Sequence, residues 1–242
     1  GLNHLSILLE ARYKNTGKDG YPIIKQNFDA YFSDLVNKHD AKPSKPGAER
    51  GVFRKLFKTY GYLPITTDSH LGEYIQWAYS VADHDAILDF YDNYKEKCLA
   101  FYDNKTSYDH YFDLKNLNTH ERVIPIIEGI LSDSAYEEPA INIPNNGYLE
   151  CLPKDIVVEV PGIINKSGIS GISFKNYPAA FGSLLNSQSG VIQMTTDAVL
   201  NASKHSAYLA LLADPVVNDS YQAEKLLNNM LETQGKFLYY LK

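Results

Sequence analysis

Three short stretches of the chain bring together side chains whose chemistry suits ligand binding. The first is Asn3-His4, which stands at the start of a strand-like segment. The imidazole there could ligate a divalent metal, and the neighbouring amide could contact a polar ligand. A partly exposed terminal histidine without a ligand is the simpler interpretation, and spacing alone favours it.

The second stretch is a tyrosine-rich loop that runs into a predicted helix. It reads Tyr60-Gly61-Tyr62-Leu63-Pro64, then Asp68-Ser69-His70, then Glu73-Tyr74. Several polar tips near a helix N-terminus can hold a sugar or an anion. A capped helix whose tyrosines only pack explains the same residues equally well.

The third stretch is a polar turn between two β-rich segments, residues 142–148. Its sequence is Asn142-Ile143-Pro144-Asn145-Asn146-Gly147-Tyr148. Asn-Gly is a common turn pair, so turn chemistry alone favours a loop without a ligand.

Several familiar site motifs are missing from the sequence. The seven histidines form no His-x-x-x-His pair, and the two cysteines, Cys98 and Cys151, form no Cys-x-x-Cys unit. A closed structural zinc site is therefore poorly supported. The sequence also contains no glycine-rich phosphate loop and no Gly-x-Ser-x-Gly hydrolase elbow. Nothing in it predicts a nucleotide cradle.

Composition narrows the class of protein further. The net charge of −6 argues against a nucleic-acid-binding face, because phosphate contacts need clustered Lys and Arg. No apolar run is long enough for a membrane span, and two cysteines favour a cytoplasmic setting over a disulfide-built secreted fold. The chain begins at Gly1 with no signal-peptide pattern, which suggests a fragment of a longer protein.

The elements that must position these residues can be read from periodicity. We expect a strand over residues 4–14, followed by a turn cluster at 15–20. Asp19 is expected to cap a helix over 21–38, with Pro22 in its first turn. Further helices are predicted over 49–60, 68–81, 85–104 and 119–131, with Pro125 bending the last one or marking a late start.

The pattern changes from residue 139. Short β-rich runs are expected at 140–143, 156–160 and 171–174, and helices from 177 onward, with breaks near 214–215 and 218. The sequence predicts one compact α+β domain over residues 1–242, mostly helical, with a small, partly antiparallel sheet.

Taken in order along the chain, four blocks resemble the C-terminal domain of glycoside hydrolase family 4. The opening block combines Gly1-Leu2-Asn3-His4-Leu5 with Gly17-Lys18-Asp19 and Tyr21-Pro22. The second combines Tyr60-Gly61-Tyr62 with Asp68-Ser69-His70-Leu71-Gly72-Glu73-Tyr74, where the family has Ser-Glu-His before its Glu-Tyr. The third and fourth are residues 142–161 and Ala213-Asp214-Pro215-Val216-Val217-Asn218.

The resemblance implies an unusual glycosidase that uses NAD and a divalent metal, with Mn²⁺ as the expected ion, in place of a carboxylate pair. The sugar is oxidised at C3 by hydride transfer to NAD, which acidifies the proton at C2. A tyrosine removes that proton, and the glycosidic oxygen leaves by elimination. Water then adds at C1, and the ketone is reduced again. The metal stabilises the charge that develops on the C2 and C3 oxygens.

Residue roles follow from the match of motifs. His4 matches the family's metal ligand, and Asn3 the adjacent residue that contacts substrate. Tyr62 is the best match to the tyrosine base, with Tyr60 as the alternative. Since an ordinary phenol has a pKa of about 10, a metal or a cation must favour the phenolate. His70, Asn146 and Gly147 match substrate-side positions.

The resemblance also implies a fold like the C-terminal domain of lactate and malate dehydrogenases. The N-terminal NAD-binding domain, with the Cys that supplies the second protein ligand of the metal, would precede Gly1. The fragment alone is expected to be inactive, and the whole enzyme to be a dimer or tetramer that acts on a glycoside. The match lies nearer the α-galactosidase and α-glucuronidase branch than the phospho-glucosidase branch. A sugar or 2-hydroxy-acid dehydrogenase, or a non-catalytic sugar-binding remnant, are the alternatives.

Overall fold

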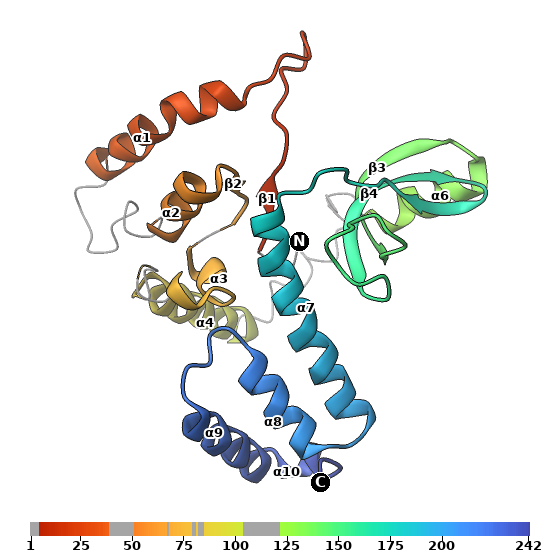
Figure 1. The fold of residues 1–242 in the computed structure, drawn as a ribbon. Helices are drawn as coiled ribbons and strands as arrows, with labels where there is room; N and C mark the ends of the chain where they lie inside the picture. Colours follow the sequence, from red (N-terminus) through yellow and green to blue (C-terminus); the bar gives the residue numbers. More distant parts are fainter. Residues whose placement is uncertain (1–4, 39–50, 67, 79–80, 82–84, 104–121) are drawn as a thin grey trace. The chain divides into compact units, whose positions relative to one another are not determined.

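Contacts divide the chain into two units, and each is described by itself. The computed structural model describes residues 5–38, 51–66, 68–78, 81, 85–103 and 122–242 (Figure 1). The first unit comprises residues 1–82, 142–159 and 173–242, and the second comprises 83–141 and 160–172. Strands β3 and β4 run from one unit into the other. Within the described part of the chain, no helix is long and apolar enough to cross a membrane.

The first unit begins with a short two-stranded ribbon. Strand β1, Ile7–Leu8, pairs antiparallel with β2, Leu63–Pro64, so that Ile7 lies opposite Pro64 and Leu8 opposite Leu63. The expected strand over 4–14 is therefore wrong in length. Beyond Leu8 the partner segment turns away at Gly61, whose φ is +78°, and residues 11–20 fold back through a tight turn at Gly17, whose φ is +67°.

Tyr21 holds the two strands of the ribbon together. Its hydroxyl donates to the carbonyl oxygen of Leu8 and accepts from the backbone N–H of Leu63, at 3.0 Å. The side chain is 8% exposed, and burial raises the pKa of its phenol. One side chain at the start of helix α1 thus contacts both strands, and Leu63 lies 42 residues further along the chain than Tyr21.

Two helices carry the aromatic part of the first core. Helix α1, Tyr21–Lys38, starts where the Asp19 carboxylate accepts from the Tyr21 backbone N–H at 2.9 Å, which confirms the predicted cap. Helix α2 is Gly51–Tyr60. Phe28 of α1 lies against Phe57 of α2, with ring centres 4.1 Å apart. The predicted helices over 21–38 and 49–60 are found, except that residues 49–50 lie outside the described ones.

The predicted helix over 68–81 begins as expected but is wrong in length; residues 79–80 lie outside the described ones. It is replaced by a short helix α3, Asp68–Gly72, and a 3₁₀ turn η1, Gln76–Ala78. Gly72 is a poor helix residue, and the break lets Leu71, Ile75 and Ala78 all reach the core, where each is at most 1% exposed. Burial of these three side chains overrides the local helical pattern.

The C-terminal part of the first unit is a run of packed helices. These are α7 Ala179–Leu200, α8 Lys204–Ala213, α9 Ser220–Thr233 and α10 Gly235–Leu238. Helix α8 lies against both α7 and α9 (Figure 1). The expected breaks at 214–215 and 218 are confirmed. The break between α7 and α8 was not predicted; there Ala202 has φ +52° and Ser203 caps α8.

Asn145 organises the polar loop between β3 and β4. Its side chain is fully buried, and the amide nitrogen donates to the carbonyl oxygens of Leu149, Leu152 and Pro153 at 2.9 to 3.1 Å. The amide oxygen accepts from the Leu149 backbone N–H at 2.9 Å. The loop is therefore fixed by a buried amide that satisfies backbone groups.

The second unit combines helices with a three-stranded sheet. Its helices are α4 Asp85–Asp103 and α6 Val123–Ser132; the strands are β3 Tyr136–Pro144, β4 Val157–Asn165 and β5 Gly168–Gly171, in the order β3-β4-β5. β4 and β5 are antiparallel.

Pro125 stands in the first turn of α6, so it marks the late start, while residues 119–121 lie outside the described chain. The predicted runs at 140–143 and 156–160 belong to β3 and β4. The run at 171–174 is wrong, because β5 ends at Gly171 and Phe174 only bridges Leu149.

A buried carboxylate lies where β3 begins. Glu138 is 1% exposed, and its carboxylate accepts from Nε of the half-exposed Arg122 at 3.0 Å and from Nη2 at 3.1 Å. These hydrogen bonds lower the pKa of Glu138, although burial acts in the opposite direction. The buried Tyr136 hydroxyl beside this pair has no hydrogen-bond partner among the described residues, and burial raises its pKa.

Acid should weaken the fold through Glu138. Since the pKa of the carboxyl is lower in the folded chain than in the unfolded one, the pair stabilises the fold above the ordinary glutamate pKa of about 4.3 and loses that effect as pH falls through the folded value. Replacing Arg122 by Leu leaves the buried carboxylate unpaired and raises its pKa. In this variant, protonation of Glu138 at low pH therefore stabilises the fold instead of weakening it. Arg122→Leu should be less stable at neutral pH and recover relative to wild type on acidification.

Urea unfolding at a series of pH values measures this. The matched control is Lys166→Gln, because the ion pair of Lys166 with Asp133 has side chains that are 76% and 46% exposed. It should change stability little at any pH. Parallel pH profiles for wild type and Arg122→Leu would contradict the role given to the pair.

Removing the Tyr21 hydroxyl should loosen the ribbon. Tyr21→Phe leaves the Leu63 N–H and the Leu8 carbonyl without their partner, so we expect a loss of about 1 to 3 kcal/mol in the free energy of unfolding. Urea denaturation provides the measurement, with Tyr221→Phe as control because Tyr221 is 82% exposed. An equal loss in both variants would argue against the bridging role.

Candidate functional site

The candidate site is a hollow beside the ribbon, here called the ribbon hollow. Its volume is about 420 Å³, within the range of about 300 to 1,000 Å³ that small-molecule pockets occupy. It is lined by Leu9, Glu10, Arg12, Asp19, Tyr21, Lys25, Tyr60, Gly61 and Tyr62. The lining thus comes from the loop after β1, the start of α1 and the turn that connects α2 to β2.

Both candidate base tyrosines line the ribbon hollow. Gly61 separates them and has φ +78°, a conformation that favours glycine, so the chain turns sharply between the two side chains. The Tyr62 ring meets Tyr21 edge-on at 6.2 Å between ring centres, and the Tyr60 ring meets Phe181 edge-on at 6.3 Å. Both tyrosines are half-buried, so each ring is held while part of its surface faces the hollow.

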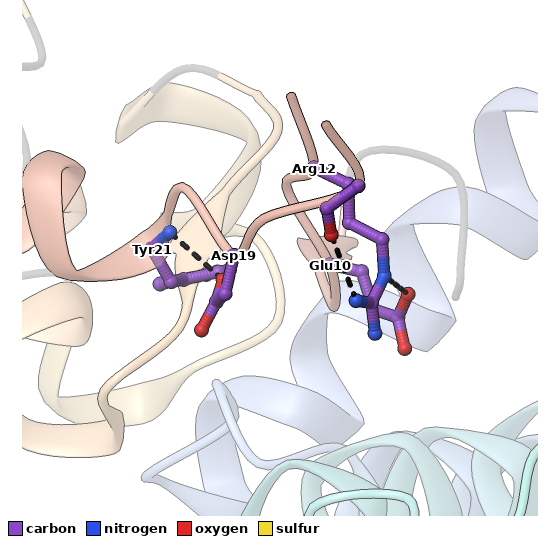
Figure 2. A network of polar contacts seen from close by, with 5 residues as sticks. Glu10, Arg12, Asp19 and Tyr21 are labelled. Carbon is purple, nitrogen blue, oxygen red and sulfur yellow. Dashed lines mark hydrogen bonds and ion pairs between the residues drawn. The ribbon is translucent and has the colours of Figure 1, made fainter. Parts of the chain in front are cut away.

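Figure 2 shows the polar contacts that Glu10, Arg12 and Asp19 make at the ribbon hollow. The Nε of Arg12 lies 2.9 Å from the Glu10 carboxylate, and its Nη1 donates to the Gly17 carbonyl oxygen at 3.3 Å. The hydrogen bond from Arg12 lowers the pKa of Glu10. The Asp19 carboxylate accepts from the Tyr21 N–H, and Nζ of Lys25 lies 5.7 Å from the centre of the Tyr21 ring.

The sequence did not identify Glu10, Arg12 or Lys25 as site residues. The only local signal was the alternation of Glu10 and Arg12, which placed both on one side of the expected strand. Lys25 lies on the first turns of α1 and reaches the hollow because Tyr21 ties that helix to the ribbon.

The other predicted site residues lie elsewhere. His70 is on α3, and its Nδ1 lies 3.4 Å from the Glu73 carboxylate. Asn146 and Gly147 lie in the loop that Asn145 fixes, where Gly147 has φ +92°. Asn3 and His4 lie outside the described residues. Of the predicted residues that the structure describes, only Tyr62, with its alternative Tyr60, lines the ribbon hollow.

The register of the ribbon orders these residues along one direction. Tyr62 precedes Leu63, which pairs with Leu8, so it stands at the end of β1 that continues to Leu9. Beyond the other end, the Ile65 N–H donates to the Ser6 carbonyl oxygen at 3.0 Å. From there the second strand leads toward α3, which carries His70.

A complete metal site is not found in the described part of the chain. No group of three or more His, Cys, Asp and Glu side chains there could hold a metal ion. Cys151 packs against Gly182, and burial raises the pKa of its thiol, which disfavours the thiolate that a metal needs.

Comparison with known proteins identifies relatives across the whole chain. Residues 1–217 match the family 4 glycosyl hydrolase C-terminal domain. An alpha-glucosidase of Erwinia rhapontici is 38% identical over 100% of this chain and 56% of its own length. An alpha-galacturonidase of Thermoanaerobacterium saccharolyticum is 27% identical over 98% of the chain and 53% of its own length. The chain spans about half the length of the curated relatives it matches.

Solved structures agree in fold. A 6-phospho-alpha-glucosidase from gut microorganisms in complex with NAD and Mn²⁺ has a TM-score of 0.69 at 20% identity, with 98% of this chain and 54% of that chain covered. A 6-phospho-beta-glucosidase of Thermotoga maritima has a TM-score of 0.61 at 20% identity, with 98% and 52% covered. The expected α+β class, mostly helical with small antiparallel sheets, is thereby confirmed. With a family match over residues 1–217 and a relative that is 38% identical over the whole of this chain, the chain belongs to glycosyl hydrolase family 4 and carries its C-terminal domain.

Proposed function

We propose that the chain is the C-terminal half of an NAD- and divalent-metal-dependent glycosidase that cleaves O-glycosidic bonds. The observation that carries the proposal is the family match over residues 1–217, reinforced by 38% identity to an alpha-glucosidase along the whole chain. The ribbon hollow supports it, because a pocket of about 420 Å³ with tyrosines and charged pairs suits a sugar.

Tyr62 is proposed as the base that removes the C2 proton of the sugar. Its hydroxyl stands on a ring that Tyr21 contacts edge-on, so its direction is set before substrate arrives. Arg12 lines the same hollow but is bound to Glu10, so Lys25, which also lines it, is the cation proposed to favour a phenolate there. When bound, NAD would supply the hydride acceptor for C3, and the metal a Lewis acid for the C2 and C3 oxygens.

The remaining residues are proposed to bind and orient. His4 would hold the metal together with a Cys of the N-terminal NAD-binding half, and Asn3 would contact the substrate beside it. His70, which the Glu73 carboxylate orients, would contact a sugar hydroxyl along the ribbon. Asn146 and Gly147 would contribute from the loop fixed by Asn145. The proposal includes a dimeric or tetrameric, cytoplasmic enzyme, in keeping with two cysteines and a net charge of −6.

Removing the Tyr62 hydroxyl should abolish most turnover in the full-length protein. Tyr62→Phe retains the ring and its contact with Tyr21, but has no atom to accept the C2 proton, so we expect kcat to fall by about 10² to 10⁴ fold. Sugar release from an α-glucoside in the presence of NAD⁺ and Mn²⁺ measures this. NADH accumulation without sugar release would instead identify a dehydrogenase.

Matched tyrosine variants locate the base. Tyr13→Phe is the control, because Tyr13 is 47% exposed and does not line the hollow. Near-normal turnover in Tyr62→Phe, with a collapse in Tyr60→Phe, would move the base to Tyr60. If both variants retain activity, the base lies outside the ribbon hollow.

Removing the imidazole of His4 should weaken the response to added metal. In full-length His4→Ala, the Mn²⁺ concentration for half-maximal activity should rise at least about tenfold, since one protein ligand is lost. A Mn²⁺ titration of activity, together with metal content after dialysis, measures this. His205→Ala on α8 is the matched control, and an unchanged titration in His4→Ala would refute the ligand assignment.

A further inference from the structure

Helix α6 of the second unit is apolar on almost every side. Among its ten residues only Glu128 is charged. One side packs on the sheet at Gly129, where an added Cβ would come within 2.5 Å of the Tyr136 ring and 3.0 Å of the Ile164 side chain. Because glycine has no Cβ, the helix can approach the sheet this closely and is fixed to it on that side.

The opposite side of α6 is exposed and carries four aliphatic side chains, here called the α6 face. They are Val123, Ile124, Ile127 and Leu131, which are 61%, 64%, 46% and 82% exposed. Successive residues of an α-helix are about 100° apart, so all four lie within an arc of about 100°, on the side away from Gly129. A helix that is apolar all round is normally enclosed on every side, whereas no described residue covers the α6 face.

The α6 face is large enough to be the centre of an interface. Four aliphatic side chains at these exposures present on the order of 400 Å² of apolar surface, a patch size that is often functional on a monomer. A standard interface takes about 800 Å² from each partner, and its fully buried centre is more apolar than its rim. The α6 face can supply that centre, with neighbouring residues as the rim.

Composition and symmetry favour a second copy of the chain as the partner. Interfaces between identical subunits are more apolar than those between transient partners, and the α6 face has no polar side chain within it. Its only charged neighbour, Glu128, stands at the border and is exposed.

The order of residues along the helix also suits self-association. Ile127 lies at the centre of the α6 face, with Ile124 three residues before it and Leu131 four residues after it. When two such faces meet about a twofold axis, the two Ile127 side chains lie against each other whichever way the helices run. Aliphatic side chains then meet aliphatic side chains along the whole contact.

We propose that the α6 face is an interface between two copies of this chain, packed face to face about a twofold axis at Ile127. The inference rests on one part of the proposed function, the dimeric or tetrameric state, and names the surface that produces it. The ribbon hollow belongs to the first unit and α6 to the second, so association can be measured apart from turnover.

Sedimentation of the full-length protein tests the interface. Ile127→Asp places two carboxylates in each apolar contact, so we expect the dissociation constant of the two copies to rise at least about 100-fold. Ile127→Ala keeps the helix and removes only contact surface, and should raise the constant at least about tenfold. Val199→Asp on α7 is the matched control, because Val199 is a 51% exposed aliphatic residue of another helix, and it should keep the wild-type constant.

A cysteine at the centre of the α6 face tests the pairing directly. In full-length Ile127→Cys, oxidation should join two copies through a disulfide between the introduced thiols, identified by mass spectrometry of the linked peptides. Val199→Cys should give no such link.

The outcomes separate this inference from the glycosidase function. Wild type that sediments as a single chain, an unchanged dissociation constant in both Ile127→Asp and Ile127→Ala, or a dimer of Ile127→Cys that does not cross-link overturns it. So does an Ile127→Asp that unfolds while Ile127→Ala keeps the wild-type constant, because the α6 face is then covered within one copy. Failure to cleave any glycoside overturns the glycosidase function and leaves the sedimentation result standing.

Discussion

The site depends first on the hydroxyl of Tyr21. It donates to Leu8 and accepts from Leu63, so one buried side chain holds both strands of the ribbon to the start of α1. The same residue lines the ribbon hollow and contacts the ring of Tyr62. A ribbon with two residues in each strand has little stability of its own. The relative positions of Glu10 and Tyr62 therefore depend on the hydrogen bonds of the Tyr21 hydroxyl, in which neither residue takes part.

Features fixed by local chemistry could be predicted from the sequence. The Asp19 cap, the helix after it and the breaks after α8 all depend on residues within a few positions, and the structure has them. The helix predicted over 68–81 failed because burial of Ile75 and Ala78 outweighed the local pattern. The long first strand failed because the segment that pairs with it turns away at Gly61, a residue that is distant in the sequence.

The site could be predicted only in part, for the same reason. Tyr62 was found through a motif, and the structure places it in a polar hollow. Lys25 had no local signal and Arg12 only its alternation with Glu10, because the ribbon hollow arises where the loop after β1, the start of α1 and the turn before β2 meet. In the loop of residues 142–148, the motif predicts Asn146 and Gly147 as substrate contacts, whereas the buried amide is that of Asn145. The sequence does not distinguish the two adjacent asparagines, and tertiary packing decides which of them is buried.

The ion pair of the ribbon hollow has a consequence for how a ligand arrives. Because the Arg12 guanidinium lies 2.9 Å from the Glu10 carboxylate, the two opposite charges largely offset each other at a distance, and salt screens what remains within about 8 Å at physiological ionic strength. This pair therefore contributes little to the long-range electrostatic steering of a ligand. Its guanidinium and carboxylate act on a ligand only after contact, by exchanging water for polar groups of that ligand.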